Sequence, residues 1–118
     1  MFEVIFYETE DGKCPVYEWL LSLEPKMRAK MTGMLTLLAE KGTELRKPYS
    51  EPIGNGIFEI RAIQGNNISR ALYFFCEGKK IIVTNGFVKK RQKTPAAEIR
   101  TAEARRKDYY RQIKGRNK

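Results

Sequence analysis

The stretch from Ile68 to Pro95, ISRALYFFCEGKKIIVTNGFVKKRQKTP, decides the fold. It is typical of two apolar strands joined by a tight turn at Glu77-Gly78. An antiparallel hairpin carries Arg70, near the start of the first strand, back towards the cations that follow the second strand. We therefore expect cations far apart in the sequence to converge on one patch of a sheet. The cations at the end of the stretch are Lys89, Lys90, Arg91 and Lys93.

Two further strands and one loop are expected outside the hairpin. Phe2–Tyr7 and Ile57–Ile63 are rich in β-branched and aromatic residues, so both are expected to join the sheet of the hairpin. The second of these strands would form a meander with the hairpin. Thr43–Asn55 holds two prolines and several charges and is expected to be a loop.

Two helices are expected between the first strand and this loop. Pro15 suits a first helical turn, and the apolar residues after it follow at helical spacing until the helix ends before Glu24. A second helix is predicted over Pro25–Lys41, with Gly42 as its stop signal. Its core stripe consists of Met27, Met31, Met34 and Leu38.

A basic helix follows the hairpin. Thr94 and Pro95 are typical of an N-cap and a first helical turn, and the helix is expected to run to about Ile113. These elements define the α+β class: a small antiparallel sheet of about four strands, with the two N-terminal helices packed on one face and a C-terminal basic helix. The basic face of that helix comprises Arg100, Lys107, Arg111, Lys114 and Lys118.

The charge of the chain is one-sided. The net charge is +9, but residues 79–118 hold 14 Lys and Arg against three acids, whereas residues 1–78 have a net charge of −2. This distribution is expected for a protein that binds an anionic partner such as nucleic acid. A solubilising face with a basic tail is the alternative.

Length and apolar content point to one domain, residues 1–118, that stays in the cytoplasm. No apolar run is long enough to span a membrane, and the first ten residues lack the features of a signal peptide. Cys14 and Cys76 do not have the paired spacing of a zinc site or a redox motif.

The absence of histidine restricts the chemistry. The chain has none, which removes the usual general acid and base for RNA cleavage. The acids are scattered and there is no glycine-rich phosphate loop, so we expect neither a metal site nor a cofactor. What remains is phosphoryl chemistry in which arginines hold the scissile phosphate, while a lysine or a carboxylate takes the 2′-hydroxyl proton.

Arg61 and Arg70 are the candidate catalytic residues on the strands. Glu59 and Arg61 lie two apart and project from the same face of a strand, where a surface ion pair is the structural alternative. Arg70 stands among apolar neighbours, where an arginine needs a partner or a ligand. A buried salt bridge would satisfy it, but we favour contact with a phosphate.

The cations after the hairpin have two interpretations. Lys89 and Lys90 are candidate catalytic residues, because crowding of like charges favours a neutral lysine that can accept a proton. A phosphate-binding patch without chemistry is the alternative. The candidate RNA-binding residues are Arg91, Lys93, Lys47 and Tyr49, the last as a ring on which an unpaired base can stack.

The order of these motifs resembles the phage-derived HigB-like branch of the RelE/ParE toxin superfamily, over nearly the whole chain. The resemblance implies the toxin of a type II toxin-antitoxin system, commonly an mRNA endonuclease that acts in the ribosomal A site. It also implies a cognate HigA-like helix-turn-helix antitoxin that neutralises the toxin in a hetero-oligomeric complex. The motifs are Ile57–Arg61, Ser69–Phe74, Gly86–Lys90 and Thr94-Pro95, followed by a helix with Glu98 and Ala102.

By motif position, the resemblance implies active-site roles for Arg61 and Arg70 on the strands and for the cluster from Lys89 to Arg91. The tyrosine that RelE-type members carry after the last strand would fall near Ala96, and the histidines of some HigB members are absent. The general base is therefore unassigned. Two other functions stay open: a ParE-like inhibitor of a DNA-handling enzyme, and a non-catalytic RNA-binding protein.

Overall fold

The computed structural model describes residues 1–88 and 93–116, and its longest strands are β4 (Asn67–Cys76) and β5 (Lys80–Val88). They form the predicted antiparallel hairpin, and Gly78 adopts a φ of +79° in the turn, a conformation that glycine tolerates. Arg70 pairs with Phe87 across the ladder. The start of β4 therefore lies beside the end of β5, as the sequence predicts.

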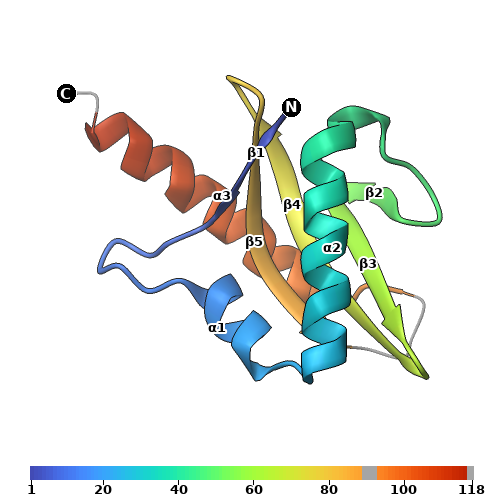
Figure 1. The fold of residues 1–118 in the computed structure, drawn as a ribbon. Helices are drawn as coiled ribbons and strands as arrows, with labels where there is room; N and C mark the ends of the chain where they lie inside the picture. The colour runs from blue at the N-terminus through green and yellow to red at the C-terminus, as the bar shows by residue number, and fades with distance from the viewer. Residues whose placement is uncertain (89–92, 117–118) are drawn as a thin grey trace.

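The sheet has five strands in the order β1-β5-β4-β3-β2, which Figure 1 shows as one twisted layer. β3 (Ile57–Gln64) pairs with β4 as predicted. β1 (Glu3–Phe6) joins the sheet as expected but runs parallel to β5, so the sheet is mixed and not purely antiparallel. The direction follows from the connection: the chain leaves β1 through two helices, enters the sheet at the opposite edge, and returns to β1 after three antiparallel steps.

The fifth strand lies in the segment predicted as a loop. Within Thr43–Asn55, the chain forms β2 (Ser50–Gly54), which pairs with β3; the short 3₁₀ helix η1 (Gly42–Glu44) precedes it. Pro52 is tolerated because β2 is an edge strand with a neighbour on only one side. The two prolines that suggested a loop therefore belong to an irregular edge of the sheet.

Helices α1 (Pro15–Ser22) and α2 (Pro25–Lys41) cover one face of the sheet, as predicted. α1 approaches β5 so closely that a Cβ on Gly86 would lie 2.3 Å from the Trp19 ring, so only glycine fits there. Fully buried residues of this core include Val16, Met31, Leu38, Ile60, Ala71, Ile81 and Val83.

Helix α3 (Ala96–Arg116) covers part of the opposite face. Ala102 is fully buried against the sheet, and the Tyr109 ring packs edge-on against Phe74. Four members of the predicted basic face are exposed, and Lys118 lies outside the described residues. Those four are Arg100, Lys107, Arg111 and Lys114.

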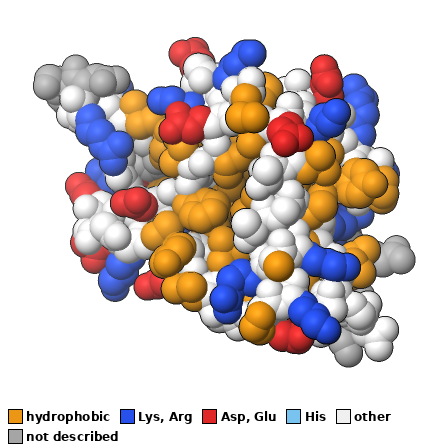
Figure 2. Space-filling view, in the orientation of Figure 1, with side chains coloured by type: hydrophobic (Ala, Val, Ile, Leu, Met, Phe, Trp, Pro, Cys, Tyr) orange, Lys and Arg blue, Asp and Glu red, His pale blue; other side chains and the backbone are white. Residues whose placement is uncertain are grey.

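An apolar groove of about 500 Å³ runs between α1, α2 and β1, and Figure 2 shows hydrophobic side chains exposed along it. Tyr17 and Leu21 are exposed at its edge. The Arg28 side chain at this groove donates to the carbonyls of Leu20 and Leu23, both at 3.0 Å, and so caps the end of α1. In the described part of the chain, no helix has the length and hydrophobicity needed to cross a membrane.

Candidate active site

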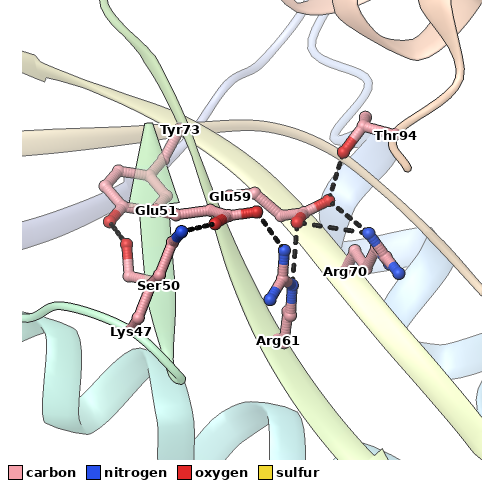
Figure 3. Close-up of polar contacts among 8 residues, drawn as sticks. All are labelled: Lys47, Ser50, Glu51, Glu59, Arg61, Arg70, Tyr73 and Thr94. Carbon is pink, nitrogen blue, oxygen red and sulfur yellow. Dashed lines mark hydrogen bonds and ion pairs between the residues drawn. The ribbon is translucent and has the colours of Figure 1, made fainter. Parts of the chain in front are cut away.

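The candidate site is a network of alternating charges on β2, β3, β4 and the turn that precedes β2, on the sheet face that α3 partly covers. Arg61 and Arg70 are cross-strand partners on β3 and β4, so the register brings the two predicted arginines together. Figure 3 shows their side chains converging on the Glu59 carboxylate. Five side chains make up this charge network: Lys47, Glu51, Arg61, Glu59 and Arg70.

Glu59 is the centre of the charge network. Its side chain is fully buried, and Arg70 Nη1 donates to its two oxygens at 3.1 and 3.3 Å. Arg61 Nε donates to Oε2 at 2.9 Å, and Thr94 Oγ1 donates to Oε1 at 2.5 Å. Several donors therefore compensate the burial of the carboxylate, as a buried charge requires.

Arg70 is only 1% exposed, and its contact with Glu59 is the buried salt bridge that stood as the structural alternative. In this arrangement its guanidinium faces a carboxylate of the protein. Arg70 is among the residues that line the groove over the sheet, but its low exposure leaves little of the side chain for a phosphate to contact. The catalytic role of Arg70 stays a prediction, and the observed geometry is that of a residue that positions its neighbours.

Arg61 remains accessible, with 22% of its side chain exposed. Its Nη2 donates to Glu51 on β2, so the guanidinium lies between two carboxylates. The ion pair with Glu59, which stood as the structural alternative, is present, but it is not a surface pair, because Glu59 is fully buried. Arg61 is thus the strand arginine that a ligand can reach.

Lys47 and Glu51 complete the charge network at its exposed end. Lys47 is exposed, and its Nζ lies 3.3 Å from Glu51 Oε2. Partial burial acts to raise the pKa of Glu51, but the hydrogen bond from Lys47 and the charge of Arg61 outweigh it and hold that pKa below its ordinary value. Glu51 is therefore ionised at neutral pH. Sequence reasoning missed it because it lies in the segment predicted as a loop.

A groove of about 440 Å³ opens over the charge network. Three cations and one acid of the charge network line the groove, and the second acid, Glu59, is buried beneath them, so the groove is cationic in excess but not purely cationic. Pro48, Ile63 and Ile68 line its remaining wall. A neighbouring hollow is lined by Lys93, Thr94 and Glu51, which places the predicted RNA contact Lys93 near the same end of the site. Lys93 is exposed.

Thr94 has a different role from the one predicted. α3 begins at Ala96, and the Pro95 carbonyl accepts the first helical hydrogen bonds, from the backbone N–H groups of Glu98 and Ile99. The Thr94 side chain binds Glu59 and does not cap the helix. It therefore ties the start of α3 to the candidate site.

The remaining predicted residues fall into two groups. Tyr49 is half exposed, and its carbonyl accepts the Arg61 backbone N–H at 3.0 Å, so it lies next to the charge network. Lys89, Lys90 and Arg91 lie outside the described residues. Within residues 1–88 and 93–116, no three His, Cys, Asp or Glu side chains gather closely enough to hold a metal ion.

The fold and this charge network define a small α+β protein with a charged groove on its sheet. A family described as phage-derived Gp49-like proteins (DUF891) matches residues 18–107. The chain belongs to this family, which is of the RelE/ParE-like toxin type. The match includes every member of the charge network and Thr94. No curated protein matches the chain.

Proposed function

We propose that this protein is a HigB-like toxin of a type II toxin-antitoxin system and that it cleaves mRNA on the ribosome. The toxin-type family and the one-sided charge support the proposal. The observation that carries it is the groove in which the accessible Arg61 lies between an ionised Glu51 and the buried Glu59–Arg70 pair. A phosphate with an adjacent 2′-hydroxyl has both a cation and a base available there.

In the proposed reaction, Lys47 and Arg61 hold the scissile phosphate, and Glu51 accepts the proton of the 2′-hydroxyl. The 2′-oxygen attacks phosphorus, and the bond to the 5′-oxygen breaks, which leaves a 2′,3′-cyclic phosphate and a 5′-hydroxyl. The phosphate is repelled by the Glu51 carboxylate, but Lys47 and Arg61 lie beside this carboxylate. Their attraction for the phosphate compensates the repulsion. No metal or cofactor takes part in these steps.

The other predicted residues have supporting roles in this proposal. Arg70 holds Glu59, and Glu59 in turn orients Arg61. Because Glu51 takes the proton of the 2′-hydroxyl, Lys89 or Lys90 acts in its charged ammonium form and donates a proton to the leaving 5′-oxygen, which gives the 5′-hydroxyl. Arg91 and Lys93 contact the RNA backbone.

The proposed biological partners are translated message in the ribosomal A site and a HigA-like antitoxin with a helix-turn-helix domain. An acidic or amphipathic segment of that antitoxin would cover part of the basic surface, in a hetero-oligomeric complex in the cytoplasm. Association steered by charge would slow as salt is raised.

The test is expression of matched variants in growing cells, followed by mapping of message 5′ ends. Wild type should arrest growth and create new message ends, whereas Arg61→Ala should do neither. Arg116→Ala is the control, because Arg116 is an exposed arginine at the far end of α3. Equal arrest and identical message ends for wild type and Arg61→Ala would contradict the proposal.

A ParE-like inhibitor of a DNA-handling enzyme is the second candidate. The observation in its favour is that the strand arginines are engaged by protein carboxylates, which suits a fixed surface better than a catalytic one. It predicts DNA-damage signalling with intact message in the same cells. A non-catalytic RNA-binding protein would instead bind RNA with steep salt dependence and cause no arrest.

A further inference from the structure

A second hollow lies on the other side of Arg61 from the charged groove. It measures about 350 Å³, within the range of small-ligand sites, and lies between α2 and the segment that leads into β2. Tyr49 and Ile63 are among the large apolar side chains that stay exposed in the described structure. Figure 2 shows hydrophobic side chains gathered beside α2 in this part of the surface. The lining includes Lys30, Met34, Pro48, Tyr49, Ala62 and Ile63.

The apolar hollow and the charged groove adjoin. Pro48, Arg61 and Ile63 line both of them, so no further element separates the two. The backbone hydrogen bond from Arg61 to the Tyr49 carbonyl holds the aromatic residue next to the cation. An apolar hollow that joins a cationic groove matches a nucleotide, whose flat base is apolar on its faces and whose phosphate is anionic.

The other tyrosines do not offer such a surface. Tyr7 and Tyr73 are buried, and the Tyr109 and Tyr110 rings both pack against Phe74. Tyr110 is 46% exposed but lines neither the hollow nor the charged groove. Tyr17 is as exposed as Tyr49, at 53% against 49%, but it lies in the apolar groove beside α1. The cation of that groove, Arg28, is occupied with the carbonyls of α1. Tyr49 is the exposed ring that stands beside the candidate phosphate site.

We propose that this hollow binds an unpaired nucleobase of the RNA whose phosphate occupies the adjoining groove, with Tyr49 as the stacking platform. Lys30 at the rim can donate a hydrogen bond to the edge of the base. The inference rests on the proposed function for its ligand class. It adds a site that reads bases, whereas the charged groove would read only the backbone.

The test measures binding of the whole protein to two short single-stranded oligonucleotides of equal length, one with bases and one abasic. Both carry 2′-O-methyl groups, so that the attacking hydroxyl is absent and no cleavage occurs. Wild type should bind the oligonucleotide with bases more tightly. Tyr49→Ala should lose about 5- to 150-fold of that affinity, the range typical of one stacked base, and should keep its affinity for the abasic oligonucleotide.

Three further variants separate stacking from effects on the fold. Tyr49→Phe should retain the preference for bases, because the ring remains. Tyr17→Ala removes an equally exposed ring elsewhere and should bind like wild type. Gly33→Leu should abolish the preference without touching Tyr49, because a Cβ at Gly33 meets nothing within 4 Å and the new side chain fills the hollow.

The outcomes separate this inference from the proposed function. If wild type binds both oligonucleotides equally, or if Tyr49→Ala and Gly33→Leu both keep the preference, the base site is contradicted while cleavage can still stand. If the preference depends on Tyr49 but the protein cuts no message in cells, the base site stands and the nuclease is contradicted. Failure of wild type to bind either oligonucleotide overturns the base site, while the mapping of message ends in cells decides the proposed cleavage separately.

Discussion

Two carboxylates tie the two ends of α3 to the sheet, and they differ in burial. Glu59, fully buried, accepts from Thr94 just before the helix and from both strand arginines. Asp108, in the second half of α3, is partly exposed and accepts from Tyr7 after β1 at 2.5 Å. Its other donors are Gln112 and Arg111, which lie on α3 itself.

This difference in burial and contacts indicates different roles: Asp108 fastens α3 to the sheet, whereas Glu59 belongs to the candidate site. The Asp108 contacts are accounted for by fastening α3 to β1. The Glu59 contacts exceed what stability requires, since a buried ion pair is seldom more stable than apolar residues of the same size. The excess is explained if Glu59 and Arg70 serve to hold Arg61 at the floor of the groove. We therefore expect substitutions around Glu59 to lower the free energy of unfolding more than substitutions around Asp108.

Removal of Glu59 should have the largest effect. Glu59→Ala takes the carboxylate away from the buried Arg70 and should lower the free energy of unfolding by about 3–5 kcal/mol. The double variant Glu59→Leu/Arg70→Met should recover most of that loss, because no charge is then buried at this position. Urea unfolding of both variants measures the effect, and a double variant no more stable than Glu59→Ala would contradict it.

Tyr7→Phe should have an intermediate effect at the other end of α3. It removes one hydrogen bond to an ionised carboxylate and should cost about 2 kcal/mol near neutral pH. Chemical denaturation at pH 7 checks the value. If Tyr7→Phe lowered the free energy of unfolding as much as Glu59→Ala, the proposed difference between Glu59 and Asp108 would be contradicted.

The contribution of this hydrogen bond should depend on pH on both sides of neutrality. Hydrogen bonds from Tyr7, Gln112 and Arg111 lower the pKa of Asp108 to about 2, so its stabilisation is full above its ordinary pKa and is lost as pH falls towards 2. Burial and the bond to Asp108 raise the pKa of Tyr7 to about 12, so its stabilisation is full below its ordinary pKa and is lost as pH rises towards 12. The stability difference between wild type and Tyr7→Phe should therefore shrink at both extremes, and a difference that is constant from pH 2 to 7 would contradict the assignment.

Arg111→Ala should have the smallest effect. Arg111 pairs with Asp108 and Glu10 at 2.6 and 3.2 Å, but its side chain is largely in solvent, where ion pairs contribute little and salt screens them. Its thermal unfolding midpoint should stay close to that of wild type and should converge with it as salt is raised. A large loss of stability that did not depend on salt would contradict this expectation, because it would show that Arg111 helps to fasten α3 to the sheet.

The hairpin and α2 were predictable from local signals. Two apolar runs on either side of the Gly78 turn, together with Pro25 and Gly42, determine their bounds, and the observed α2 coincides with the predicted Pro25–Lys41. β2 was missed because its pairing with β3 compensates for residues that disfavour strands. The parallel pairing of β1 was missed because strand direction depends on the order of the whole sheet.

The candidate site was predictable only in part. The sequence places Arg61 and Arg70 on neighbouring strands, and the observed cross-strand register brings them together. The burial of Glu59 and Arg70 depends on how distant segments cover them, including Thr94, which lies 35 residues after Glu59. Glu51 lies beside Arg61 because β2 pairs with β3, and the sequence did not predict β2. The roles of Lys89, Lys90 and Arg91 stay predictions.

The most direct test of the central claim is the cleavage rate of Glu51→Gln on translating ribosomes with a defined message. This substitution keeps the shape of the side chain and removes its ability to take a proton, so the account predicts a rate about 10²- to 10⁴-fold below wild type. Urea unfolding should confirm that the fold is retained. A folded Glu51→Gln protein that cleaves message at the wild-type rate would contradict the assignment of this groove as the active site.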